Sequence, residues 1–172
     1  GSTAEHLVRE ARVPVLLVAA PRDRAPERIL VPVDQSDISA HVLRTARSLG
    51  VRFGADVTAL HVVGSGVMTQ VLAAASTLGA TPPIPQEPLR IDAQTRAGEW
   101  LARLASTGAD TELAVDTEVV PGQPTHEIVA FAERSQADLI VIGRIGTGGL
   151  RRAVLGSVLD AVLRQAPCPV LV

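Results

Sequence analysis

The chain has 172 residues, which is enough for one α/β domain with a sizeable core or for one domain with an appendage. Apolar residues make up 47% and charged residues 20%, a balance typical of a folded domain. The net charge is −2 and only 2% of residues are aromatic, so the chain lacks the positive charge and stacking surfaces that nucleic-acid binding needs.

Residues 1–19 are similar in sequence to the C-terminal end of the chain. GSTAEHLVREARVPVLL (1–17) and GSVLDAVLRQAPCPVLV (156–172) are identical at seven of seventeen positions without a gap. Both combine apolar residues at helical spacing with a proline and a β-rich run. We interpret residues 1–19 as the last helix and strand of a preceding, similar domain. The alternative is a generic amphipathic helix and strand, with Gly1-Ser2 left from cloning.

Residues 20–27 are charged and punctuated by proline, which predicts a linker before a domain at 28–172. In that domain apolar strands alternate with amphipathic helices, which predicts a parallel sheet covered by helices on both faces. Such sheets bind ligands beyond the carboxyl ends of their strands, where the strand order switches. The strands are predicted at 28–33, 56–63, 111–120, 138–142 and 168–172, and the helices at about 37–52, 87–107, 124–135 and 158–166.

Several local features follow from the turn and cap residues. We expect Ser36 or Asp34 to cap the helix that begins near residue 37, and Gly50 to Gly54 to close it. Residues 64–86 are interpreted as a short helix or an insertion. Further expectations are inward-facing Ile91, Trp100, Leu101 and Leu104, a turn at Pro121-Gly122, and Pro124 in the first turn of a helix.

Residues 137–158 combine a buried strand, a series of glycines and a helix start. The apolar run 139–142 ends at Gly143, further glycines follow, and Ser157 opens an apolar-periodic run. This layout can hold a phosphate against bare backbone at a helix N-terminus. It is neither a Walker A loop, which needs Gly-Lys-Ser/Thr, nor a dinucleotide-binding G-x-G-x-x-G. The alternative is that the glycines are turn and cap residues, with Ser157 a plain N-cap.

The domain at 28–172 resembles the universal stress protein family. The similarity lies in ILVPVDQS (29–36), ADLIVIG (137–143), GGLRRAVLGSV (148–158) and APCPVLV (166–172), and in the family's G-2x-G-9x-G-Ser signature. The resemblance implies an open five-stranded parallel sheet of order 3-2-1-4-5, Rossmann-like and of the adenine nucleotide alpha hydrolase type. It also implies that ATP, with or without Mg²⁺, binds between the ends of strands 1 and 4. The sequence departs from the family at Arg144-Ile145, where Ser or Thr with Arg, His or Lys is common.

The resemblance assigns nucleotide-binding roles at the ends of these strands. Asp34 would hydrogen-bond the adenosine part, because a carboxylate at a strand end can accept from ribose hydroxyls. Its alternative role is a helix cap. Val33 and Val62 would line the adenine slot, with simple burial as the alternative. The predicted nucleotide-binding residues are Val33, Asp34, Val62, Gly143, Gly146, Gly156, Ser157 and Val158.

Other polar candidates are assigned to structure rather than chemistry. His61 lies within a buried strand and is interpreted as a core histidine, and Cys168 as a core residue. The remaining histidines are scattered without ligand spacing, so no metal site is predicted. A single cysteine excludes a disulfide within the chain. The sequence has no signal-peptide pattern and no apolar run of membrane-spanning length, so we expect a cytoplasmic protein without membrane insertion.

The expected function is an ATP-binding regulatory or stress-response module with little or no hydrolysis. No nucleophile elbow and no pair of carboxylates suggests catalytic residues. The alternatives are a slow nucleotide hydrolase or transferase on the same fold, and a nucleotide-free scaffold that dimerises. Strand 168–172 is short and apolar at the sheet edge. The resemblance implies that it pairs with its counterpart in a homodimer, and residues 13–19 would replace that counterpart in a tandem pseudo-dimer, within one molecule or between two.

Overall fold

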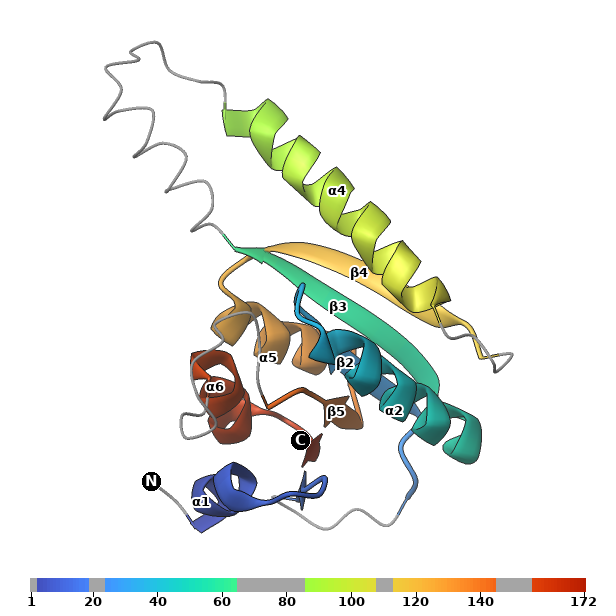
Figure 1. Cartoon of the computed structure of the whole chain (residues 1–172), viewed down its shortest axis with the longest axis vertical. Coiled ribbons are helices and arrows are strands. Elements are labelled where there is room, and N and C mark those ends of the chain that lie inside the picture. Colours follow the sequence, from blue (N-terminus) through green and yellow to red (C-terminus); the bar gives the residue numbers. More distant parts are fainter. Residues whose placement is uncertain (1–2, 19–23, 65–85, 108–112, 145–155) are drawn as a thin grey trace.

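The computed structural model describes residues 3–18, 24–64, 86–107, 113–144 and 156–172 (Figure 1). The strands are β1 (Leu16–Leu17), β2 (Arg28–Pro32), β3 (Asp56–Gly64), β4 (Val115–Gly122), β5 (Leu139–Val141) and β6 (Val170–Leu171). The helices are α1 (Thr3–Glu10), α2 (Ile38–Phe53), α4 (Gln86–Ser106), α5 (Pro124–Arg134) and α6 (Ser157–Gln165).

The six strands form one sheet of order β1-β6-β5-β2-β3-β4. The strands from β2 to β6 are mutually parallel, and numbered from β2 they follow the predicted order 3-2-1-4-5. The sheet has one strand more than the five predicted, because β1 pairs with β6 in an antiparallel orientation. Leu16 lies opposite Leu171, and the backbones of Val15 and Val172 exchange two hydrogen bonds of 3.0 Å. The N-terminal segment therefore pairs with the last strand within one chain.

Helices cover both faces of the sheet (Figure 1). Successive residues of a strand point to opposite faces, so Ile29 packs under α2 and α4 while Leu30 packs under α5 and α6. Val8 of α1 is only 2% exposed and belongs to the α5–α6 cluster. No helix in the described ranges has the length and apolarity needed to cross a bilayer.

The start of α2 differs from the prediction, because neither Ser36 nor Asp34 is its N-cap. The N-cap residue is Asp37, whose side chain makes no capping bond. Asp34 Oδ1 instead accepts from the backbone N–H of Ser36 at 3.1 Å and from the hydroxyls of Ser36 and Ser39. The carboxylate thus holds the turn before the helix. At the other end Gly54 closes α2 in the left-handed conformation, with φ 67°.

Two further expectations are wrong. Ile91 is 55% exposed, because the N-terminal part of α4 extends past the ends of β3 and β4 (Figure 1). Pro121 and Gly122 do not turn the chain but continue β4, opposite Val63 and Gly64. A proline is tolerated there because β4 is an edge strand, so the N–H that proline lacks is not needed to donate to a neighbouring strand. The predicted insertion at 64–86 lies outside the described residues, apart from its two ends in β3 and α4.

The described part of the linker is fixed to the N-terminal end of the sheet by Asp138. This carboxylate is 4% exposed. Its Oδ2 accepts from the backbone N–H groups of Glu27 and Arg28 at 3.1 Å each, and its Oδ1 accepts from Arg24 at 3.0 Å. The linker therefore enters β2 along a defined path, at the end of the sheet opposite to Asp34.

Candidate functional site

The strand order reverses between β2 and β5. From β2 the chain builds outward to β3 and β4, whereas from β5 it builds in the opposite direction to β6. Ile29 of β2 lies opposite Leu139 of β5, so Asp34 and Gly143 follow the carboxyl ends of neighbouring parallel strands. Crossovers that leave in opposite directions open a crevice at this point. The structure thus brings two of the predicted site residues to the same end of the sheet, where the parallel strands terminate, hereafter called the edge.

Asp34 is half-buried and held firmly at this edge. Besides the bonds to its Oδ1, the Ser39 hydroxyl donates to the Asp34 carbonyl at 2.6 Å. Ser39 is 3% exposed, so the contact is shielded from solvent. The carboxylate is therefore an acceptor whose position is set before any ligand arrives.

The two valines predicted to line an adenine slot lie on different faces of the sheet. Val33 is 7% exposed and packs in the α2–α4 cluster, whereas Val62 is half-buried against the α5–α6 cluster. They do not share one apolar cluster, and the slot stays a prediction. His61 Nδ1 lies 2.9 Å from the Val33 carbonyl, and its ring meets Trp100 edge-on at 5.0 Å. These contacts give His61 a structural partner, as interpreted, but the residue is half-buried and lies in neither core cluster.

No side chain of the N-cap residue caps the N-terminus of α6. Gly156 is the N-cap and Ser157 the first helical residue, and both are exposed. Gly156 offers no side chain to the first-turn N–H groups, and a Cβ built there would meet nothing within 4 Å. Unpaired N–H groups and the helix dipole favour a phosphate at such a terminus. Val158 is half-buried against the core.

The central part of the glycine pattern lies outside the described residues. Gly146 falls within 145–155, which lies outside the described residues. Among the residues that are described, no group of three or more His, Cys, Asp or Glu side chains could hold a metal ion. The edge therefore offers an acceptor at Asp34, bare backbone at Gly143 and an uncapped helix start at Gly156 and Ser157.

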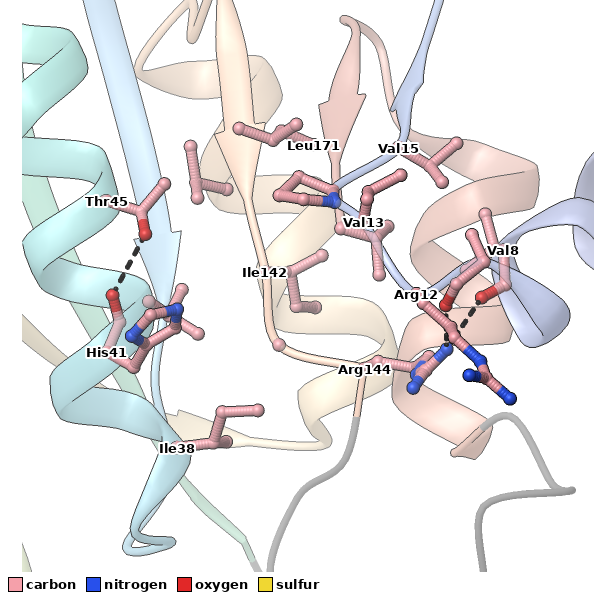
Figure 2. A pocket seen from close by; sticks show the side chains of 16 residues that line it. Val8, Arg12, Val13, Val15, Ile38, His41, Thr45, Ile142, Arg144 and Leu171 are labelled. Atoms are coloured by element: carbon pink, nitrogen blue, oxygen red, sulfur yellow. Dashed lines mark hydrogen bonds between the residues drawn. The ribbon is translucent and has the colours of Figure 1, made fainter.

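A small cavity of about 190 Å³ lies beside Gly143 (Figure 2). Ile38, His41 and Thr45 of α2 line one side, and the segment between α1 and β1 lines the other. Next to it, Arg144 Nη1 donates to the carbonyls of Val8 at 3.3 Å, Arg9 at 3.1 Å and Ala11 at 2.7 Å. The first residue after Gly143 is thus tied to the C-terminal end of α1.

The contact between Arg144 and α1 was not predicted from the sequence. Two signals could have suggested it. Ile142, just after β5, packs in the α5–α6 cluster on one face of the sheet, and Arg144 follows it by two positions. The repeat between residues 1–17 and 156–172 places the N-terminal helix on that same face. Neither signal alone specifies a hydrogen bond.

The comparisons with known proteins agree with this architecture. The profile of the universal stress protein family matches residues 26–172. A universal stress protein of Methanocaldococcus jannaschii is 35% identical over 146 residues, which cover 85% of this chain and 81% of that protein. A universal stress protein of Mycolicibacterium smegmatis is 30% identical over 178 residues, which cover all of this chain and 55% of that protein.

Solved structures share the fold. A universal stress protein from Pseudomonas aeruginosa superposes with a TM-score of 0.69 at 19% identity, over 98% of this chain and 54% of that one. A universal stress protein solved in complex with cAMP superposes with a TM-score of 0.51 at 22% identity, over 86% of this chain and 96% of that one. With the profile match and the relative from M. jannaschii, the conclusion is direct: the chain belongs to the universal stress protein family.

Proposed function

We propose that the chain binds an adenine nucleotide, ATP above all, and acts as a regulatory or stress-response module with little or no hydrolysis. The observation that carries this proposal is the meeting of Asp34 and Gly143 at the ends of the adjacent strands β2 and β5. The ligand class is supported by a relative of the same fold that was solved with cAMP, another adenine nucleotide.

Each group at the edge has a defined part in binding. The Asp34 carboxylate, oriented by Ser36 and Ser39, accepts from ribose hydroxyls. Gly143 permits close approach of the backbone, and the first turn of α6 donates N–H groups to the phosphates. Gly146 belongs to the same proposal, and Mg²⁺ would arrive on the phosphates. These are binding and orienting roles, and none of them moves a proton to or from a reacting atom.

Calorimetry with ATP tests this proposal, with mass spectrometry of the nucleotide released from denatured protein as a second readout. Asp34→Asn should weaken ATP binding about tenfold, because an acceptor of charge-assisted hydrogen bonds is lost. Asp37→Asn is the matched control, since Asp37 is exposed and its side chain makes no capping bond. It should change the affinity less than about twofold.

Three outcomes would contradict the proposal. A chain that releases no nucleotide and gives no heat with ATP would behave as a nucleotide-free scaffold. An equal loss of ATP affinity in Asp34→Asn and Asp37→Asn would indicate a general electrostatic effect rather than a specific contact at Asp34. Phosphate release within seconds that disappears in Ser157→Ala would make the protein a hydrolase.

The proposal extends to the N-terminal segment. We regard residues 1–19 as the end of a preceding similar domain, 20–27 as a linker and 28–172 as the universal stress protein domain. The antiparallel pairing of β1 with β6 is the pairing expected of a second copy of β6. The relatives from M. smegmatis and P. aeruginosa, about half of whose length the chain spans, support a tandem arrangement.

A further inference from the structure

Arg144 joins two features that the proposed function treats separately, the glycine-rich edge and helix α1. Its Nη1 donates to three carbonyls at the end of α1, those of Val8, Arg9 and Ala11. Figure 2 shows Arg144 reaching toward Val8 in this helix. The last carbonyls of a helix have no partner within the helix, so the guanidinium satisfies groups that would otherwise need water. Within the part of the chain that the structure describes, the side-chain hydrogen bonds of Arg144 all come from Nη1.

The guanidinium keeps its charge in this contact. The three acceptors are neutral carbonyls, and a guanidinium stays protonated in proteins. Five N–H donors in a planar fork leave Nε and Nη2 available to an anion. Because α1 fixes the side chain, a ligand that meets these donors would lose less side-chain entropy than it would with a mobile arginine.

The position of α1 also gives Arg144 an electrostatic task. A helix C-terminus carries partial negative charge, and α1 ends next to the residue that follows Gly143. Unscreened, this charge would oppose a phosphate at Gly143. The arginine at the end of α1 reverses the sign of the local charge.

We infer that Arg144, held by the C-terminal carbonyls of α1, contacts the phosphates of the bound nucleotide, so that docking of α1 and nucleotide binding strengthen each other. This inference rests on the proposed function. Coupling between two binding events is reciprocal, so the nucleotide must also tighten α1 onto the domain. The preceding helix would thereby take part in the nucleotide site of the domain that follows it.

The first test compares ATP with adenosine by calorimetry on the full chain. Arg144→Ala should weaken ATP binding about tenfold and leave adenosine binding unchanged, because the contact is with phosphate. Arg144→Lys retains a charged donor and should recover most of the loss. Arg12→Ala is the matched control, because Arg12 is exposed beside the same cavity and makes no hydrogen bond within the described ranges. It should change the ATP affinity less than about twofold.

The second test reads α1 itself. ATP should slow amide hydrogen exchange in residues 7–11 of the wild-type chain, and it should not do so in Arg144→Ala. Val8→Ala removes packing that holds α1 on the domain, since Val8 is buried in the α5–α6 cluster, and it leaves the Arg144 side chain itself unsubstituted. It should weaken ATP binding a few-fold in the wild-type background and have no further effect in Arg144→Ala.

The outcomes separate this inference from the proposed function. Equal ATP affinity in the wild type and Arg144→Ala overturns the coupling and leaves nucleotide binding standing. Tighter ATP binding in Arg144→Ala also overturns it, because α1 would then be withholding the arginine from the ligand. A wild-type chain that binds no ATP overturns both. Additive effects of Val8→Ala and Arg144→Ala assign the two residues to separate roles and contradict the coupling.

Discussion

At the scale of single residues, two aspartates mark the two ends of the central strand pair. Asp34 follows the carboxyl end of β2, where the proposed ligand binds, and Asp138 precedes β5 at the other end. Asp34 is half-buried, whereas Asp138 is 4% exposed. Both carboxylates bind their own backbone, but only the half-buried Asp34 lies where the proposed ligand could also reach it.

Asp138→Ala should lower the free energy of unfolding by about 1–2 kcal/mol, because it leaves the partly buried N–H groups of Glu27 and Arg28 without their acceptor. The lost ion pair adds little, since Arg24 is 56% exposed. Urea denaturation monitored by circular dichroism measures the change. The control is Asp116→Ala on the exposed face of β4, expected within about 0.5 kcal/mol of wild type. Equal losses in the two variants would refute the anchoring role of Asp138.

At the scale of elements, two helical glycines should respond to alanine with opposite signs. Gly54 ends α2 at φ 67°, a conformation that costs an alanine about 1 kcal/mol, so Gly54→Ala should destabilise the protein by about that amount. Gly98 lies within α4, and a Cβ there meets nothing within 4 Å. Gly98→Ala should stabilise the protein by about 0.5–1 kcal/mol. Thermal unfolding measures the change in melting temperature of each variant. Changes of the same sign in the two variants would contradict the prediction.

Most elements were predictable because their signals are local. Hydrophobic periodicity located α4 and the parallel strands, and Pro124 marked the start of α5 as expected. The continuation of β4 through Pro121 was missed because it depends on β4 being an edge strand, which is a property of the sheet. Ile91 was assigned inward by its spacing, but spacing does not show where the sheet beneath a helix ends.

The candidate site was predictable to the extent that it follows strand ends. Asp34 and Gly143 could be placed at one edge from the strand pattern and the family resemblance. The role of the Asp34 carboxylate in its own turn was not predictable, because the choice between capping and turn geometry depends on backbone angles. Arg144 was missed for a different reason: its partners are carbonyls of α1, and backbone acceptors leave no trace in a sequence.

At the scale of the whole molecule, α1 and β1 cover an edge that would otherwise be open. In the described residues β6 is flanked by β5 on one side and β1 on the other. Removing β1 exposes the main-chain groups of Val170–Leu171 to a second molecule. The segment itself leaves large apolar side chains exposed, among them Leu16 at 55% and Val13 at 71%. A preceding domain would cover such a surface.

Deleting residues 1–20 should therefore change the oligomeric state. The truncated chain is expected to dimerise through β6, and static light scattering of both chains measures the change in mass. Leu16→Ser in the full chain is the control, because it removes an exposed apolar side chain and retains the backbone pairing with Leu171. It should leave the assembly unchanged. An unaltered mass after the deletion would refute the role of β1 as a substitute for a partner strand.

The pairing of β1 with β6 also bears on how the chain folds. Leu17 meets Val170, about 150 positions further along the chain, so this contact closes a loop that contains the rest of the domain. Both strands are only two residues long, and their short ladder cannot offset the entropy of that closure before the sheet between them has formed. We therefore expect α1 and β1 to dock last, onto a sheet that is already assembled. During synthesis β1 would remain unpaired until β6 had left the ribosome. A truncation that removes β6 would therefore also leave β1 without its partner strand.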